Sequence, residues 1–392
     1  MRFLTAGESH GEALNAIISE FPSGVKIDTD FINYELARRQ MGYGRGQRMS
    51  IEKDEIKILS GVKNLVSTGS PISLIIKNLD WQNWKTKPAE MEKILNPRPG
   101  HADLCGFLKY RLDDIRDVIE RSSARETAAR VAVGAFAKLF LRSFEIFVLS
   151  FVEQIGKIKI DYKLYSGLIS KNFNPLKNKN DNYFLSKIES SFLRCPDENA
   201  SEKMLELLNK TIKAGDTLGG SVRVISSGMI IGLGSFTQWD KRIDAKIASA
   251  LMSIPSVKAI SFGTDVYKVF KKGTEYHDEI FYNKELGFYR KKNNAGGIEG
   301  GMTNGENIEV QVFIKPIPTT TSGLKTVDIK TKKETISLKE RSDICAVPSI
   351  AVISESMLAI ELMNAIQDKF GNDNMDEIIA NYNNYKKYLA NV

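Results

Sequence analysis

The feature that most constrains the fold is a helix-like run of small residues between Ala124 and Ser143. Alanine recurs around much of the circumference of this helix, and not along one stripe, at Ala128, Ala129, Ala132, Ala135 and Ala137. A helix of this kind is expected to be buried and closely packed on more than one side. Ser123 and Glu126 match a capping box, which would direct the free N–H groups and the positive end of the helix dipole toward residues 121–123.

Strand-like and helix-like segments follow one another in mixed order along the rest of the chain. Runs rich in β-branched and aromatic residues predict strands at Leu14–Phe21, Ile72–Ile76, Ile146–Val152, Ser221–Ile225, Lys258–Phe262 and Ile308–Ile314. Helical patterns predict helices at Phe31–Gln40, Ala124–Ser143, Glu202–Ala214, Asp240–Ser253 and Ser354–Phe370. The order lacks the regular alternation of a doubly wound sheet and favours the α+β class. The polar stretch 170–182 is expected to be an exposed loop or insertion.

Charge and cysteine content narrow the class of protein. The 392 residues carry 55 Lys and Arg against 48 Asp and Glu, and the net charge of +7 suits nucleic acid, an anionic surface or a small polyanion. Three cysteines without a CxxC pair argue against a disulfide framework and a structural zinc site, so no metal is predicted. Glu8 comes too early for a signal peptide, and no run of about 18 apolar residues is seen, which predicts a cytoplasmic protein without a membrane span.

Histidine is scarce, and two of the three residues stand in glycine-flanked segments without an apolar period. These segments are Gly7–Gly11, which holds His10, and Arg98–Asp103, which holds His101. An imidazole pKa of about 6.5 allows proton exchange near neutrality, so both are candidate acid–base residues. Each, taken alone, is more often an ordinary loop histidine. His277 lies among charged residues, and no role is predicted for it.

An arginine- and glycine-rich segment follows the first predicted helix. It contains Arg38, Arg39, Arg45 and Arg48, with glycines at positions 42, 44 and 46. Guanidinium groups bind phosphate and carboxylate in bidentate fashion, and glycine lets backbone N–H groups converge on an anion. We interpret the segment as an anion clamp. An RNA-binding segment and a plain solvated loop are the alternatives, although repeats and base-stacking aromatics beyond Tyr43 are missing.

Three further segments carry groups that could bind a ligand. Asn294–Gly301 is a glycine cluster whose spacing does not fit a dinucleotide fingerprint, and a turn without a ligand is equally expected. Lys315–Ser322 combines two prolines with four hydroxyls and one ammonium, and could also be a rigid strand exit. Arg341–Cys345 places a cation and a carboxylate on one side if extended, or forms a weak surface ion pair. The core is the expected place of Trp81, Trp84 and Trp239.

Taken together, these segments resemble the chorismate synthase family, in the family's order and over essentially the whole chain. The matching motifs are Gly7–Gly11, Arg38–Met49, Arg98–Leu104, Glu120–Arg130, Arg194–Asp197, Gly215–Gly220, Asn294–Gly301, Lys315–Thr320 and Arg341–Cys345. Two positions depart from the pattern. Ser342 stands where the family often has histidine, so a third imidazole near the flavin is not expected. Ile344 stands where the family usually has proline.

The resemblance implies a fold, a reaction and partners. The fold would be a single-domain β-α-β sandwich over residues 1–392, with antiparallel sheets enclosing a layer of helices and a polar loop insertion near 170–182. The reaction would be the last step of the shikimate pathway in aromatic amino-acid biosynthesis. It is a 1,4-anti elimination that converts 5-enolpyruvylshikimate 3-phosphate to chorismate and phosphate and requires reduced FMN. The lyase would be monofunctional, because no segment is long enough for a flavin reductase domain. The family is typically homotetrameric, so a homotetramer is expected. An external reductase would supply the flavin, and NADPH would act only indirectly.

The same motif match implies roles for individual residues. His10, His101 and Asp343 are the expected catalytic residues, with His10 at the leaving phosphate and the other two near the flavin. The substrate is expected at Ser9, Arg39, Arg45, Arg48 and Arg125. The flavin is expected at Arg121, Ser122, Ser123, Pro255, Ser256, Gly300, Lys315, Pro316, Ile317, Pro318, Thr319 and Arg341. No nucleic-acid or membrane partner is expected. The alternatives are a basic RNA-binding protein and a flavoprotein with net redox chemistry, although no nicotinamide-binding fingerprint is found.

Overall fold

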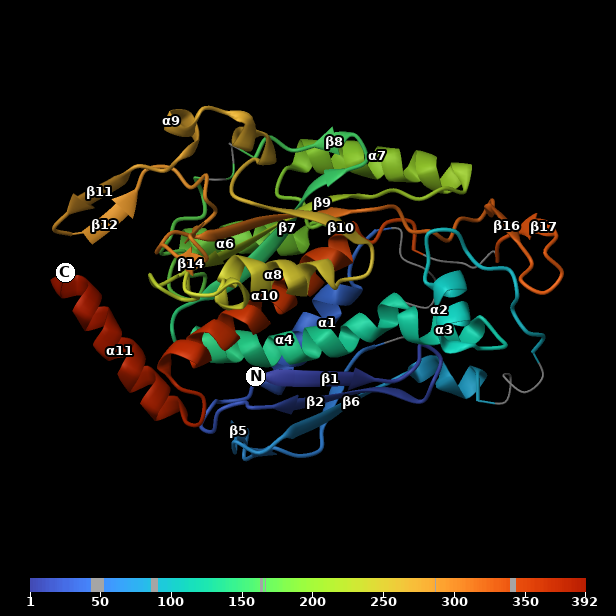
Figure 1. Ribbon diagram of the computed structural model, residues 1–392, viewed down its shortest axis with the longest axis horizontal. Helices are drawn as coiled ribbons and strands as arrows, with labels where there is room; N and C mark the ends of the chain where they lie inside the picture. The colour runs from blue at the N-terminus through green and yellow to red at the C-terminus, as the bar shows by residue number, and fades with distance from the viewer. Residues whose placement is uncertain (44–52, 86–90, 163–164, 166, 286, 339–342) are drawn as a thin grey trace.

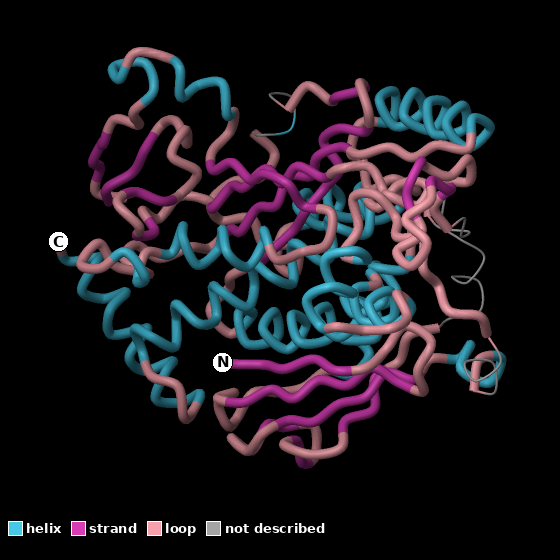
Figure 2. The backbone as a smooth tube through the Cα atoms, turned by 45° about the vertical axis from the view of Figure 1, so that its right-hand side comes forward, coloured by secondary structure: helices cyan, strands magenta, loops and turns pink. Residues whose placement is uncertain are grey.

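Two antiparallel sheets lie on either side of a layer of helices (Figure 1), and a turned view gives the same order of layers (Figure 2). The computed structural model describes residues 1–392 except 44–52, 86–90, 163–164, 166, 286 and 339–342. The four-stranded sheet has the order β1-β2-β6-β3, from β1 (Arg2–Ala6), β2 (Ala13–Ser19), β6 (Ile72–Lys77) and β3 (Ile56–Ile58). The five-stranded sheet has the order β10-β15-β9-β7-β8, from β10 (Val257–Phe262), β15 (Ile308–Ile314), β9 (Gly220–Ser227), β7 (Phe147–Ile155) and β8 (Ile158–Lys159).

Two long helices form the centre of the middle layer. They are α4 (Thr127–Arg142), which packs on the four-stranded sheet, and α10 (Val347–Phe370), which packs on the five-stranded sheet and on α4. Helices α1 (Thr29–Gln40) and α8 (Ile243–Met252) lie beside them. The expected sandwich of antiparallel sheets around helices is therefore confirmed.

Further helices and hairpins surround the sandwich. The helices are α2 (Asp103–Tyr110), α3 (Arg116–Ser122), α6 (Lys179–Ser190), α7 (Glu198–Ala214), α9 (Gly273–Tyr276) and α11 (Met375–Asn391). Short 3-10 helices occur at η2 (Leu79–Asn83), η3 (Ala124–Glu126), η4 (Trp239–Lys241) and η5 (Val266–Phe270). The two-stranded hairpins are β4 (Val62–Lys63) with β5 (Val66–Ser67), β11 (Ile280–Asn283) with β12 (Gly287–Arg290), β13 (Ile298–Glu299) with β14 (Met302–Thr303), and β16 (Lys325–Val327) with β17 (Glu334–Ile336).

The two sheets differ in how they are buried. In β2, Leu14, Ala16 and Ile18 are buried and alternate with exposed residues, so one face of this sheet packs on the helices and the other faces outward. Strands β9 and β15 are buried along almost their whole length. The middle of the five-stranded sheet is therefore covered on both faces, whereas its edge strand β10 is partly exposed.

The predicted elements all form, with shifted ends. The six predicted strands are β2, β6, β7, β9, β10 and β15, and the five predicted helices include α1, α4, α7, α8 and α10. The last predicted helix starts earlier than expected, at Val347, because a proline in its first turn has a backbone angle that suits a helix N-terminus. The loop expected over 170–182 was wrong for its last four residues, which belong to α6 and follow the N-cap Asn178.

The capping box expected before α4 does not form. Ser123 accepts a hydrogen bond from the backbone N–H of Arg125, which starts the short η3 helix instead. Glu126 points toward Arg130, whose Nε lies 2.9 Å from its carboxylate. The chain passes from α3 to α4 through this 3-10 turn, which is tighter than the first turn of an α-helix.

One described helix, α10, is long and apolar enough to cross a membrane by length and composition. However, 89% of its most apolar window is buried in the protein. Burial on this scale is the pattern of a core helix, and the charged Glu355 within it is also fully buried.

The helical layer is thin because α4 and α10 touch through small residues. Every residue of α4 from Thr127 to Leu141 is buried except Arg130, which confirms the buried alanine-rich helix. At the contact, a methyl group on Gly134 would lie 2.3 Å from Ser356 Cβ and 2.6 Å from Ser356 Cα. Only a hydrogen atom at position 134 lets the two helices approach this closely.

We expect Gly134→Ala to lower the free energy of unfolding by about 1–3 kcal/mol, the cost of overpacking. The sign is informative, because alanine in a helix otherwise stabilises by about 1 kcal/mol relative to glycine. Urea denaturation followed by circular dichroism measures the difference. Gly167→Ala is the matched control, since a Cβ there meets nothing within 4 Å and should change stability by less than about 0.5 kcal/mol. A more stable Gly134→Ala protein would contradict the close contact.

A buried cluster of six charged side chains joins α1, α4, α6 and α10. Arg38 lies at its centre, with Nη1 donating to Glu355 at 2.8 Å and Nη2 donating to Glu189 at 2.7 Å. The other members are Glu35, Lys138 and Arg194, so three cations face three carboxylates. Arg38 therefore points into the core and is not part of an anion clamp, which corrects that part of the interpretation of residues 38–48.

The cluster makes stability depend on pH. Burial alone would raise the pKa of Glu189, but the ion pairs and hydrogen bonds with Arg38 and Arg194 outweigh it and lower the pKa to about 2. A carboxylate with a depressed folded-state pKa stabilises the fold above its unfolded pKa of about 4.3 and loses this contribution as pH falls. Complete burial would raise the pKa of Glu355, but the ion pairs with Arg38, Lys138 and Arg194 lower it.

We expect Glu189→Gln to be less stable than the natural protein at pH 7, with the difference shrinking by about 1 kcal/mol or more as pH falls from 5 toward 3. Urea denaturation across this range measures both proteins. Glu202→Gln, at an exposed position of α7, is the control and should show no such convergence. A stability difference that stays constant with pH would show that the charge of Glu189 does not stabilise the fold.

Candidate functional site

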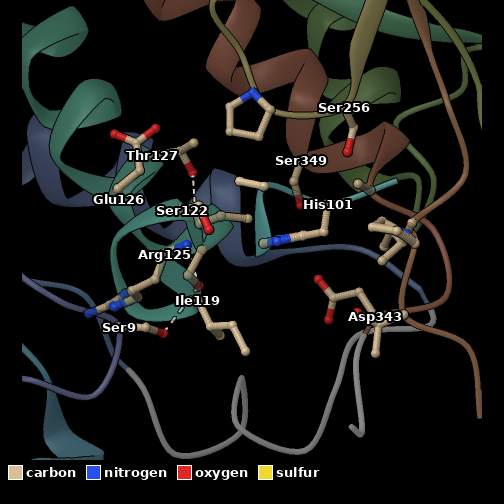
Figure 3. Close-up of a pocket in the computed structure, with 18 of the residues that line it drawn as sticks. Ser9, His101, Ile119, Ser122, Arg125, Glu126, Thr127, Ser256, Asp343 and Ser349 are labelled. Atoms are coloured by element: carbon tan, nitrogen blue, oxygen red, sulfur yellow. Dashed lines mark hydrogen bonds between the residues drawn. The ribbon is translucent and has the colours of Figure 1, made fainter. Parts of the chain in front are cut away.

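Eight described segments that are far apart in the sequence meet around one cavity of about 930 Å³. They are residues 9–10 after β1, 39 near the end of α1, 80–84 at η2, 98–102 before α2, 119–130 across α3, η3 and the start of α4, 254–256 after α8, 315–319 after β15, and 343–353 at the start of α10. Figure 3 shows the side chains of these segments pointing into a shared space. The N-terminal ends of both central helices therefore open onto the cavity, with their free N–H groups and positive dipole ends.

His10 is held on two sides. Its ring nitrogen Nδ1 lies 2.6 Å from Glu120 Oε1, and its backbone N–H donates to Glu120 Oε2 at 2.6 Å. The indole of Trp84 stacks on the ring, with centroids 3.9 Å apart and planes at 29°. These contacts fix the imidazole at the cavity wall.

His101, which also lines the cavity, is held in a similar way. Its Nδ1 lies 2.5 Å from Asp103 Oδ1, and Arg98 Nε donates to the other oxygen of Asp103 at 2.9 Å. Burial would raise the pKa of Asp103, but the hydrogen bonds from His101 and Arg98 lower it well below the usual range. In Figure 3 the His101 ring and the carboxylate of Asp343 face the same part of the cavity.

Two buried arginines share one carboxylate at the cavity floor. Arg39 Nη2 donates to Asp54 Oδ2 at 2.9 Å and Arg125 Nη1 donates to Asp54 Oδ1 at 2.6 Å. Arg125 also donates from Nε to Asn78 Oδ1 at 2.8 Å. Burial raises the pKa of Asp54, and the two guanidiniums more than reverse that shift and lower it. One negative charge thus keeps two cations in place and leaves an excess positive charge at the floor.

Four further cations line the walls: Arg98, Arg121, Arg130 and Lys315. Arg121 donates to the carbonyl and hydroxyl oxygens of Thr5 at 3.0 and 2.9 Å, which joins α3 to β1. The Lys315 ammonium donates to the carbonyl of Gly100, which joins the 315–319 segment to the His101 loop. Burial and the neighbouring Lys258 lower the pKa of Lys315.

Hydroxyl groups and an apolar wall complete the lining. Ser123 Oγ donates to Ser9 Oγ at 3.1 Å, which connects the start of the α4 segment to the His10 loop. The other hydroxyls belong to Ser122, Thr127, Ser256, Thr319 and Ser349. Ile254, Ile350 and Ile353 form an apolar surface next to them. Among the described residues no group of three or more His, Cys, Asp or Glu side chains could hold a metal ion.

Most residues predicted for the site line this cavity. They are Ser9, His10, Arg39, His101, Arg121, Ser122, Ser123, Arg125, Pro255, Ser256, Lys315, Ile317, Pro318, Thr319 and Asp343. Three others, Arg45, Arg48 and Arg341, lie outside the described residues, as does Ser342.

Two predicted residues do not line the cavity. Pro316 is exposed, since neighbouring residues of an extended segment point to opposite sides and Lys315 and Ile317 point inward. Gly300 lies at the wrong end of α8: the adjacent Gly301 accepts from the N–H of Ile243 at the start of that helix, whereas the cavity lies beyond its end.

Several residues of the site were missed from the sequence. Glu120, Asp103 and Asp54 are carboxylates that hold the predicted histidines and arginines. Glu120 and Asp103 stand inside matched motifs without a role assigned to them, and Asp54 follows the Arg38–Met49 motif. Trp84 was expected in the core but stacks on His10 at the cavity. Trp239 was also expected in the core and is 78% exposed.

Comparison with known proteins gives the family of the chain. A family model described as chorismate synthase matches residues 1–367. The chain belongs to the chorismate synthase family. Relatives named chorismate synthase include one from Sulfurihydrogenibium sp. (strain YO3AOP1), 48% identical over 400 residues with 100% of both chains covered, and one from Endomicrobium trichonymphae, 46% identical over 395 residues with 99% of both covered. A crystal structure of chorismate synthase matches with a TM-score of 0.80 and 38% identity, over 100% of this chain and 98% of that one.

Membership of the chorismate synthase family gives the reaction that the chain catalyses, the final step of the shikimate pathway. In that reaction 5-enolpyruvylshikimate 3-phosphate loses phosphate from C3 and a hydrogen from C6. The site must therefore support an elimination that separates a phosphate from a carbon framework.

Proposed function

We propose that this cavity binds 5-enolpyruvylshikimate 3-phosphate and reduced FMN together, and that His10, His101 and Asp343 handle the protons of the elimination. The observation that carries the proposal is the pair of histidines, each oriented by a carboxylate, in a cavity lined by cations. A volume of about 930 Å³ is at the upper end of small-molecule sites, about 300–1,000 Å³, which leaves room for the substrate beside the flavin ring.

Charge balance supports the same pair of ligands. The substrate has two carboxylates and a phosphate and FMN has another phosphate, which amounts to about six negative charges, since a phosphate monoester carries about −1.5 to −2 near neutrality. Such charges repel strongly at low dielectric unless cations separate them. Arg39 and Arg125 at the floor, together with Arg45 and Arg48, are the proposed substrate ligands, and Ser9 adds a hydroxyl.

The other lining residues fit a flavin phosphate and ring. Arg121, Ser122, Ser123, Ser256, Lys315 and Thr319 provide cations and hydroxyls, and Pro255, Ile317 and Pro318 provide apolar surface. Arg341 is proposed to join them. When bound, reduced FMN lends electron density as the C3–O bond breaks and assists removal of the C6 hydrogen. No net oxidation results, so the chain needs no nicotinamide site of its own.

The three proposed catalytic residues act at different atoms. Nδ1 of His10 faces Glu120, so Nε2 is the nitrogen left for the ligand, and it donates to the departing phosphate when the ring is protonated on both nitrogens. His101, fixed by Asp103, is proposed to set the protonation of the flavin site. Asp343 is proposed to accept or relay the proton that leaves the substrate.

Other properties are inferred from the family. We expect a cytoplasmic homotetramer that receives reduced flavin from an external reductase, with NADPH acting only through that reductase. We expect neither nucleic acid nor a membrane as partner. The RNA-binding alternative is weakened because Arg38 and Arg39 both pair with internal carboxylates and cannot track a nucleic-acid backbone in this arrangement.

We predict that His10→Ala and His101→Ala each reduce turnover at least about 10-fold, within the range that positioned acid–base groups contribute. The assay uses photoreduced FMN without oxygen and follows chorismate absorbance and released phosphate. His277→Ala is the matched control and should keep full activity, because that residue lies at the end of α9, outside the cavity lining. Full activity in both of the first two variants would remove the proposed catalytic roles.

A further inference from the structure

We propose that Glu120 is a positioning residue of His10, and that Trp84, which stacks on the His10 ring, is a second one. The inference rests on the catalytic role proposed for His10. It assigns a function to two residues that the motif match left without one.

Glu120 binds the His10 loop at three points. The N–H of Ser9 donates to the Glu120 backbone carbonyl at 3.0 Å, and the N–H of His10 donates to Glu120 Oε2 at 2.6 Å. The third contact joins His10 Nδ1 and Glu120 Oε1 at 2.6 Å. One carboxylate therefore holds both the backbone and the ring of His10, and the ring cannot rotate without losing its contact with Oε1.

This arrangement decides which nitrogen serves the reaction. A carboxylate only accepts hydrogen bonds, so Nδ1 carries the proton in this contact and Nε2 is the nitrogen left for a ligand. The side chains of His10 and Glu120 are 25% and 15% exposed, so the contact is shielded from bulk water on most sides. A neutral histidine with a free choice of tautomer would not present Nε2 in one fixed state.

Trp84 fixes the plane of the ring. Its indole stacks on His10 at 3.9 Å between centroids, and its own Nε1–H donates to Asp80 Oδ2 at 2.9 Å. Glu120 holds an edge of the imidazole and Trp84 covers a face. The two contacts together restrict both rotations of the side chain, which is the precision that a proton donor in a crowded cavity requires.

Substitution of Glu120 tests the positioning role more cleanly than substitution of Asp103, the carboxylate that holds His101 in the same way. Asp103 is 1% exposed and also binds Arg98, so its loss would leave a buried guanidinium without its partner and would damage the fold. Glu120 is partly exposed on a short helix. The matched control position is Asp117, an exposed carboxylate three residues earlier on the same helix.

A double-mutant cycle tests the link to His10. We expect Glu120→Ala to lower kcat about 10- to 100-fold, the range seen when a group that orients a functional histidine is removed, with KM changed less than about twofold. Added to His10→Ala, it should cause no further loss, because a residue that acts through another has no effect once that residue is gone. Glu120→Gln, which keeps the shape but has one acceptor oxygen, should lie between. Asp117→Ala should match the natural protein.

Histidine-selective ¹⁵N NMR gives a readout that does not depend on turnover. With three histidines in the chain, His10→Ala, His101→Ala and His277→Ala assign the ring signals. We expect His10 to be protonated at Nδ1 in the natural protein and to shift toward the Nε2–H tautomer in Glu120→Ala, while the His277 signals stay unchanged.

The two experiments separate failure of this inference from failure of the proposed function. An unchanged His10 tautomer in Glu120→Ala, or losses of kcat that add fully in the double variant, would overturn the positioning role. If His10→Ala keeps full activity while the tautomer shifts as expected in Glu120→Ala, the positioning role of Glu120 stands and the catalytic role proposed for His10 fails.

Discussion

The contact between α4 and α10 determines the rest of the structure. Gly134 and the surrounding alanines let the two helices approach until Ser356 packs directly against the α4 backbone. A layer this thin lets both sheets close over it and bury their inner faces. It also sets Glu355, next to Ser356 on α10, against Lys138 on α4. The buried charge cluster is therefore a consequence of the same close approach, and it locks the relative position of the helices because a displaced member would leave an unpaired charge in the core.

The cavity follows from the same packing. Both central helices begin on one side of the molecule, which brings Arg125 from η3, just before α4, and Ser349 from the first turn of α10 to a common space. Chain segments from both sheets end at that side and add His10, Ser256 and Lys315. A site assembled from eight described segments has little freedom to rearrange, because most of the segments adjoin a sheet or a buried helix. Rigid support of this kind is what a reaction between two bound anionic molecules needs.

Sequence patterns predicted the layers better than the details of the site. Strands such as β2 and β9 and the helix α4 have periodicity or composition that depends only on neighbouring residues. Adjacent Arg38 and Arg39 show where this fails. They are about 100° apart around α1, so one enters the core cluster and the other reaches Asp54 at the cavity, and no local signal distinguishes them. The place of Trp84 also depends on a partner from another segment, His10, and is invisible to a local pattern.

Carboxylates behind the cations explain how a cavity for anions can exist before its ligands arrive. Guanidiniums and imidazoles gathered without counter-charges would repel one another and turn outward. Asp54 between two arginines and Asp103 beside Arg98 and His101 offset that repulsion and fix the donors in place. Each carboxylate is more deeply buried than the group it holds, so the cations remain between the carboxylates and the cavity. An entering phosphate therefore meets donors whose geometry is already set and need not order them, which is the electrostatic preorganisation on which the proposed elimination relies.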